Sequence, residues 1–456
     1  MGARGVGSGR EADIPRCYRR SRPLRVALGS TAGAQPAKLQ PLAALFRPCT
    51  LTFALAAPAR WFLASVATYM VPNGIQMVLL PYLMAIELNQ SASRFGLTQM
   101  VGQLPLMLFL LVGGWMADRV DARRWLMQLQ AGAVLMPLVL AWLIWRGHSS
   151  EWAVLAYAFA WGMVGAFSLP ARDGLLKRVA GVNVQRMVTL AIGTQFATQM
   201  AGQALAGRAA QWGVVGVLLV QAAVAAIGVW VAAQLPRGRG RTADAPEQPR
   251  SSLWVELGAG LSLIASTPVL RATYLVTLGM GIFFGGMFLV IMPLAVRDLY
   301  SGSAQDISLA YVVFALGTLL SVFGLMRRGG SRRPGRALLL SQLTGCLALA
   351  PIALGPPAWC YYLCIFFWGM SGGMAMTMSR TIMQEQSPPS HQARVMAAYT
   401  LATTGGGPLG ALIAGQVVGL AGVRGAILLP ILGVLTMSSL SLATHSILKL
   451  RSGSHG

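Results

Sequence analysis

Twelve runs of about 20 mostly apolar residues follow one another along this chain, and they restrict its fold more than any other feature. A helix of that length crosses the hydrocarbon core of a bilayer, and backbone groups in lipid must bond within their own segment. Runs this long fit helices rather than the shorter alternating strands of a membrane barrel. The runs lie near residues 61–86, 96–117, 124–146, 152–171, 187–210, 213–235, 269–296, 305–326, 337–355, 358–378, 394–420 and 424–448. We therefore predict an all-α membrane protein with twelve transmembrane helices.

The charge of the chain follows the same arrangement. Only 11% of the residues are charged, yet the net charge is +23, a value that also occurs in nucleic-acid-binding proteins. Arginine and lysine concentrate in every second connection between the apolar runs. By the positive-inside rule these connections and both termini are cytoplasmic. We therefore expect a multi-pass membrane protein with both termini in the cytoplasm, surrounded by the lipid bilayer and without a nucleic-acid partner.

An internal repeat divides the chain into two halves. A shift of 208 residues places Arg172 on Arg380, Arg186 on Arg394 and Gly202 on Gly410, in register with the apolar runs. Two six-helix pseudo-repeats follow. The predicted divisions are a basic, disordered extension (1–60), a first bundle (61–235), a cytoplasmic linker with an amphipathic segment (236–268), a second bundle (269–448) and a tail (449–456).

A short polar loop, residues 113–124 (GGWMADRVDARR), separates the second and third runs. It resembles the loop signature of the major facilitator superfamily, G-x-x-x-D-R-x-G-R-R. Residues 169–172 (LPAR) and 393–396 (ARVM) resemble the branch that includes enterobactin exporters and macrolide-efflux proteins. The resemblance implies the major facilitator fold, with a substrate site near the midplane between two parallel halves. It also implies coupling to protons.

The signature loop holds an acid and three arginines beside the membrane. Asp118 can cap the second helix, while Arg119, Arg123 and Arg124 can bind carboxylates or helix carbonyl ends. The interactions of such a cluster can stabilise one conformation of the protein and be absent from another. Arginines that only set topology are the alternative, but orientation needs no acid. Asp121 stands where the family usually has glycine, and we expect it to accept a left-handed turn.

The resemblance implies a second charged switch at the cytoplasmic end of the fourth helix. Arg172 and Asp173 stand there, Arg380 is the repeat mate, and Arg394 opens the eleventh helix. Arginines that snorkel at helix ends are the alternative interpretation. No Asp, Glu, Lys or His falls in the middle of the twelve runs, so the residues themselves indicate no buried proton carrier.

Uncharged polar residues are the candidates for lining a cavity. Three glutamines recur every fourth residue on the fifth helix, and an amide patch with a tyrosine lies on the first. Methionines on the tenth helix and phenylalanines on the seventh offer adaptable apolar walls. Helix packing alone is the alternative role for the amides. The predicted cavity residues are Tyr69, Asn73, Gln76, Gln195, Gln199, Gln203, Phe284 and Met374.

Signals for catalysis or metal binding are weak in this sequence. Residues 369–373 match G-x-S-x-G, but they fall inside a helical run without the strand that a nucleophile elbow requires, so we expect helix packing. The four histidines lie in loops or near the C-terminus and form no ligand pattern. We expect neither an enzyme nor a cofactor or metal site.

We predict a monomeric secondary transporter of the bacterial inner membrane. By alternating access it exports a small amphiphilic molecule, such as a siderophore or a drug-like compound, in exchange for protons. Residues 406–410 (GGPLG) resemble the Gly-Pro packing motif of antiporters in this superfamily, which favours export. The alternatives are an uptake symporter of a small organic solute and a non-transporting membrane sensor or assembly protein with the same fold.

Overall fold

The computed structural model describes residues 57–117, 120–180, 184–236, 253–328, 330–389 and 391–442. Within these ranges every regular element is a helix and none is a strand. The predicted all-α class is therefore confirmed. Eight helical segments in the described ranges, four in each half, are long and apolar enough to cross a membrane.

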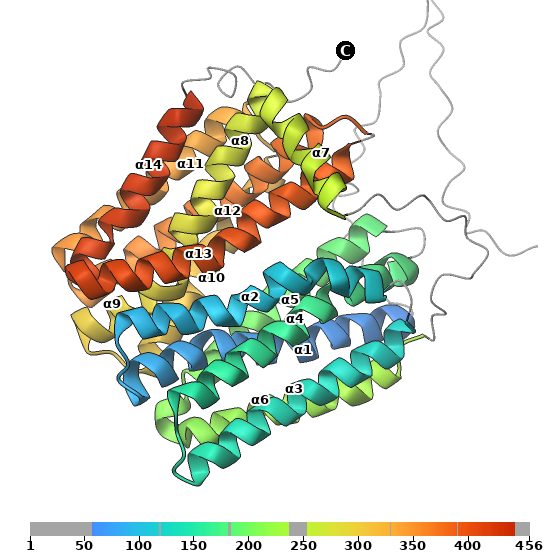
Figure 1. Ribbon diagram of the computed structural model, residues 1–456, viewed down its shortest axis with the longest axis vertical. Coiled ribbons are helices and arrows are strands. Elements are labelled where there is room, and N and C mark those ends of the chain that lie inside the picture. Colours follow the sequence, from blue (N-terminus) through green and yellow to red (C-terminus); the bar gives the residue numbers. More distant parts are fainter. Residues whose placement is uncertain are drawn as a thin grey trace, which may run out of the picture. The chain divides into compact units, whose positions relative to one another are not determined.

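The described residues of the first half form six helical segments, whose course can be followed in Figure 1. They are α1 (Ala57–Tyr82) with its π-helical end η3 (Leu83–Glu87), α2 (Ala92–Ala117), α3 (Ala122–Trp145), α4 (Glu151–Ala180), α5 (Val184–Ala206) and α6 (Ala209–Ala233). α2 and α5 are not among the eight, but their 26 and 23 residues are enough to span a bilayer.

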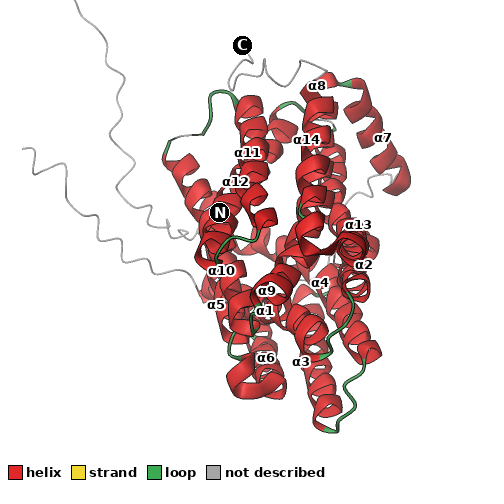
Figure 2. Cartoon of the chain, turned by 90° about the vertical axis from the view of Figure 1, so that its left-hand side faces the viewer, coloured by secondary structure: helices red, strands yellow, loops and turns green. Residues whose placement is uncertain are grey.

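In the second half, the part that the structure describes also forms six helical segments, after the connecting helix α7 (Leu253–Ser266). The first combines α8 (Pro268–Gly279), η4 (Met280–Phe284), η5 (Met287–Ile291) and α9 (Met292–Tyr300). The others are α10 (Ala304–Arg327), α11 (Pro334–Leu349) with η6 (Ala350–Leu354), α12 (Ala358–Glu385), α13 (Gln392–Ala426) and α14 (Leu428–Leu442). Figure 2 shows these helices and the loops that join them.

The two halves use the same helix pairs. α1 packs on α5, α2 on α4 and α3 on α6, while in the second half η4 and η5 pack on α13, α10 on α12 and α11 on α14. Gly202 on α5 lies so close to α1 that an added Cβ would overlap the Val71 carbonyl. Its repeat mate Gly410 on α13 would overlap the Ile282 carbonyl in the same way. Small residues that let two backbones meet therefore hold the same place in both halves, as the repeat predicted.

Two glycines mark the helix boundaries that apolar runs alone define poorly. Gly213 has φ +71° between the fifth and sixth spans, and Gly422 has φ +67° between the eleventh and twelfth. A side chain with a Cβ rarely adopts this region, so the chain turns at the glycines. Gly422 falls in the predicted break between runs, and Gly213 is the first residue of the predicted sixth run.

The predicted amphipathic segment after the linker forms α7, which packs on the start of α13. A Cβ on Gly260 would lie 2.6 Å from the carbonyl oxygen of Arg394. Gly369, in the G-x-S-x-G match, lies inside α12 against the Phe314 carbonyl, while Ser371 Oγ donates to the Phe367 carbonyl at 3.0 Å. This motif therefore packs helices, as predicted.

Candidate functional site

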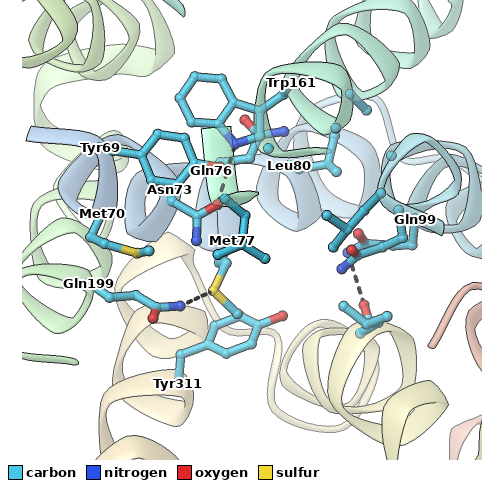
Figure 3. A pocket seen from close by; sticks show the side chains of 18 of the residues that line it. Tyr69, Met70, Asn73, Gln76, Met77, Leu80, Gln99, Trp161, Gln199 and Tyr311 are labelled. Atoms are coloured by element: carbon cyan, nitrogen blue, oxygen red, sulfur yellow. Dashed lines mark hydrogen bonds between the residues drawn. The ribbon is translucent and has the colours of Figure 1, made fainter. Parts of the chain in front are cut away.

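A cavity of about 310 Å³ lies among α1, α2, α4 and α5, closed by Leu289 and Tyr311 from the second half (Figure 3). Six amide side chains line it: Asn73, Gln76, Gln99, Gln103, Gln195 and Gln199. Among the described residues on its wall, none is Asp, Glu, Lys, Arg or His. The surface is thus polar but uncharged.

A second cavity of about 440 Å³ adjoins the first across the boundary between the halves. The two share five lining residues: Met77, Gln103, Gln199, Leu289 and Tyr311. The rest of its wall comes mainly from η4, α10, α12 and α13 and is largely aromatic or sulfur-bearing. Phe314 and Trp368 form its most compact ring pair, with centroids 4.7 Å apart, and Phe284 meets Trp368 edge to face at 5.8 Å.

Several amides of the two cavities lack strong partners. The Nε2 of Gln199 donates to the sulfur of Met77 at 2.8 Å, and thioether sulfur is a weak acceptor. The Oε1 atoms of Gln76 and Gln203 are buried without a hydrogen-bond partner among the described residues. An unpaired buried carbonyl destabilises a protein, so a hydrogen bond from an N–H or O–H group of a ligand or of water would stabilise these oxygens.

Two aromatic rings, those of Tyr69 and Trp161, pack together on the wall of the first cavity. The Tyr69 and Trp161 rings lie nearly parallel, with centroids 6.4 Å apart, and the Trp161 Nε1 donates to Asn73 Oδ1 at 3.4 Å (Figure 3). On α4, Arg172 places its Cζ atom 3.8 Å from the centre of the Tyr69 ring. The arginine side chain is almost completely buried, whereas the next residue, Asp173, is exposed.

The structure places seven of the eight predicted cavity residues on the walls of these two cavities. Tyr69, Asn73, Gln76 and Gln195 line the first, Gln203 and Phe284 line the second, and Gln199 lines both. Each four-residue step turns a helix by about 40°, so the three glutamines of α5 wind from one cavity into the other.

Met374 is on neither wall and packs against the hydrophobic core. Met376 lines the second cavity instead, on the stripe of α12 that also carries Trp368 and Gly372. These three residues are four apart, so they share a helix face, while Met374 lies half a turn away. The sequence shows that this helix is rich in methionine, but its composition does not show which helix face lines the cavity.

Sequence reasoning missed the contribution of α2. Gln99 and Gln103 line the first cavity at the same four-residue spacing that drew attention to α5. This signal was present in the sequence. The ring cluster of Phe288, Tyr311 and Phe314 could not be found in this way, because aromatic residues in apolar runs serve equally well as core or lipid-facing residues.

The two halves are fastened together at one end. Arg297 on α9 donates from Nη1 to the carbonyls of Ala85 and Gln90, at 3.2 and 3.1 Å. The Ser308 hydroxyl on α10 donates to the Gln203 carbonyl at 2.7 Å. These contacts join the end of the first span to α9, and α5 to α10.

The same end also holds the backbone contact between α2 and α13. The Gly96 and Gly415 backbones meet there, and a Cβ on Gly96 would lie 2.6 Å from the Ala411 carbonyl. Gln99 Nε2 also donates to the Leu289 carbonyl at 2.9 Å, just beside the cavity. Access past this end therefore requires several inter-half contacts to break.

The predicted charged residues are spread over separate helices. Asp118 and Arg119 lie outside the described residues. Arg123 is half-buried and Arg124 exposed at the start of α3, Arg380 is exposed on α12, and Arg394 is half-buried at the start of α13. A latch or coupling role for these residues, and for Arg172 and Asp173, stays a prediction.

Asp121 corrects one expectation. It has φ −64° and ψ 113°, so it makes no left-handed turn. Its Oδ1 accepts hydrogen bonds from the backbone N–H groups of Arg123 at 2.8 Å and Arg124 at 3.4 Å. The aspartate is the N-cap of α3, and an oxygen-bearing side chain satisfies the otherwise unpaired amides there better than glycine does.

Comparison with known proteins agrees with this architecture. The family model of the Major Facilitator Superfamily matches residues 62–411. The enterobactin exporter EntS of Salmonella typhimurium is 24% identical over 371 residues, covering 76% of this chain and 80% of the exporter. EntS of Escherichia coli O81 is 24% identical over 321 residues, covering 67% of this chain and 72% of the exporter.

Solved structures show the same fold. The nucleoside transporter NupG superposes with a TM-score of 0.68 at 13% identity, covering 86% of this chain and 99% of NupG. A bacterial homologue of the human lysosomal transporter Spinster superposes with a TM-score of 0.65 at 13% identity, covering 86% of this chain and 97% of the homologue. With the family model matched over most of its length, the chain belongs to the major facilitator superfamily of membrane transporters.

Proposed function

We propose that this transporter exports a small amphiphilic molecule, such as a siderophore or a drug-like compound, across the bacterial inner membrane by alternating access. One observation carries the proposal: the two adjoining cavities offer an amide-lined wall and an aromatic, methionine-bearing wall to the same space. Such a space suits a ligand with one hydrogen-bonding side and one apolar side. A simple ion would instead require several fixed counter-charges.

Two observations support export as the direction of transport: the names of the relatives and the distribution of basic residues along the chain. The two relatives described above are named enterobactin exporters and are each 24% identical to this chain. The positive-inside rule places both termini in the cytoplasm. In that orientation we propose that the contacts of Arg297 and Ser308 close the outer end, so that an exported substrate enters the cavities from the cytoplasmic side.

We propose protons as the exchanged ion, because proton entry across 100 mV supplies about 2.3 kcal/mol per charge. The described cavity walls carry no carboxylate that could shuttle the proton. The proposed carriers are the carboxylates near helix ends: Asp118, Asp173 and Glu87. The Tyr82 hydroxyl donates to Glu87 Oε1 at 2.7 Å, a contact that protonation of Glu87 would weaken.

The test is efflux from bacteria that lack their own siderophore and drug exporters and express this chain. Cells are loaded with either enterobactin or the neutral amphiphile Nile red, and retention is followed with and without a protonophore. We expect faster loss of at least one compound than from cells without the chain, and slower loss once the gradient collapses.

Each alternative gives a different result in the same assay. Accumulation in place of loss would identify an uptake symporter. Unchanged efflux with the protonophore would refute proton exchange and leave export intact. No movement of any amphiphile would contradict transport and favour the non-transporting sensor or assembly protein.

A further inference from the structure

Arg172 continues the cavity-facing stripe of α4. Trp161, Gly165 and Leu169 line the first cavity from this helix. Arg172 follows Leu169 by three residues, so it lies on the same helix face, one turn further along. Its partner in the stack, Tyr69, is itself a wall residue. The guanidinium therefore lies directly behind one ring of the cavity wall.

The burial of this cation is unusual for an arginine that serves only membrane topology. Arg172 is 5% exposed, and its Nε and Nη1 atoms have no hydrogen-bond partner in the part of the chain that the structure describes. A snorkelling arginine places its head in water. The repeat mate Arg380 is exposed, as topology alone requires.

Stacking on Tyr69 offsets only part of the cost of this arrangement. A guanidinium over an aromatic face is attracted to the ring, but the contact satisfies none of its N–H donors. A buried charge without a hydrogen-bonded partner destabilises the folded state. An anionic oxygen that reached these donors would supply the missing acceptor in a geometry that guanidinium favours.

We propose that Arg172 is the anion-binding residue of the substrate cavity, so that the amphiphile carries a carboxylate or a comparable anionic oxygen. The inference rests on the proposed function and narrows its substrate class. The amides beside Tyr69 then hold the polar atoms next to the anion. The aromatic wall of the second cavity takes the apolar body.

The test compares two probes that share a ring system and differ in charge. Tritiated 2-naphthoate is an anion at neutral pH, and 2-naphthamide is its neutral counterpart. Binding of each is measured on the purified full-length protein in neutral detergent. We expect the wild type to bind the naphthoate about tenfold more tightly than the amide. In Arg172→Gln this preference falls to about twofold or less, while the affinity for the amide is unchanged.

Arg178→Gln is the matched control, because Arg178 is exposed six residues further along the same helix. It should keep the wild-type preference. Arg172→Met is the second variant if Arg172→Gln does not fold, since methionine removes the two buried N–H donors that lack partners. Without ligand, both Arg172 variants should unfold at or above the wild-type temperature. Naphthoate should raise that temperature for the wild type only.

The outcomes separate the two proposals. Equal affinity of the wild type for both probes would overturn the anion site and leave a cavity for amphiphiles. A naphthoate preference that survives in folded Arg172→Gln or Arg172→Met would also overturn it. Absence of binding of either probe to the wild type would contradict the proposed amphiphile cavity as well.

Discussion

The two halves of the transporter place corresponding residues on the two cavity walls, yet the chemistry of those residues is opposite. At the spacing of 208 residues, Asn73, Gln76, Gln103 and Gln199 of the first half correspond to Gly281, Phe284, Tyr311 and Gly407 of the second. The first set is all amide, whereas the second is glycine and aromatic. Helix packing has therefore stayed the same while the side chains at the cavity have diverged.

This difference distinguishes the residues that hold the helices together from the residues that line the cavities. Gly202 and Gly410 keep the same backbone contact in both halves, because any side chain there would prevent two helices from meeting. Arg172 and Arg380 occupy equivalent positions too, but one is buried under Tyr69 and the other is exposed. Equivalent positions in the two halves therefore keep the same helix packing, but their residues need not have the same function. The function has to be argued from the residues of the cavities.

The largest effects should come from the residues that the halves share. Gly202→Leu and Gly410→Leu each force apart two helices in contact and should cost about 3 kcal/mol or more. We expect both variants to lose most of their yield of monodisperse protein, measured by size-exclusion chromatography. Gly193→Ala is the control on α5, since nothing lies within 4 Å of its added Cβ. Normal yield for one leucine variant alone would show that the halves do not use equivalent contacts.

A smaller effect should follow when the contact across the halves is cut. Arg297→Gln removes charge-assisted hydrogen bonds to the Ala85 and Gln90 carbonyls, which are worth about 1.5–3 kcal/mol. The fastened end should open more often. A cysteine placed at Ser93, with the native cysteines replaced, should then react with a maleimide about tenfold faster.

Arg94→Gln provides the comparison for that experiment. Arg94 pairs with Glu151 at 2.7 Å at the same end of the molecule, but both residues belong to the first half. Its loss should leave the maleimide rate close to that of the parent protein. Equal acceleration by both variants would mean that Arg297 does not hold the halves together.

The role of the amides in the first cavity can be tested by replacing one of them with an apolar residue, the kind that lines the second cavity. Gln76→Leu removes a buried, unpaired Oε1 and should weaken binding of 2-naphthamide about fivefold, or about 1 kcal/mol, with little change in stability. Gln130→Leu is a suitable control, because Gln130 is buried in α3 away from both cavities. If the two variants bind the amide equally well, the Gln76 amide is a packing residue, as the alternative interpretation held.

The smallest expected effect concerns the signature loop. Asp121→Ala removes the N-cap of α3 and should cost about 1 kcal/mol of stability, seen as a lower unfolding temperature. Asp121→Ser should recover most of the loss, because a hydroxyl can also cap the helix. Loss of transport at unchanged stability would assign Asp121 to coupling instead.

Much of the fold could be predicted from the sequence, because lipid leaves a backbone few options. Apolar runs gave the helix segments, and the glycine and arginine register revealed the repeat. The π-helical turns at Met280 and Met287 were not predicted. Their apolar sequence is compatible with either helix type, and packing against α13 distinguishes them only in three dimensions.

The site was predictable where polar residues interrupt apolar runs. Gln195 and Gln199 were found because they recur at helical spacing, whereas a single helix amide such as Gln130 lies away from both cavities. Met374 was chosen over Met376 because composition does not fix the phase of a helix. The burial of Arg172 was also invisible, since the sequence shows an arginine near a helix end but not the tyrosine that covers it.

Transport by the purified protein is the most direct test of export through this cavity. Liposomes that carry the protein inside-out, with an acidic lumen, are given the amphiphile whose efflux from cells the chain promotes. Proton exit should drive accumulation of the amphiphile in the lumen, and collapse of the pH gradient should release it. Uptake that is independent of the pH gradient, or that requires an alkaline lumen, would contradict proton-coupled export.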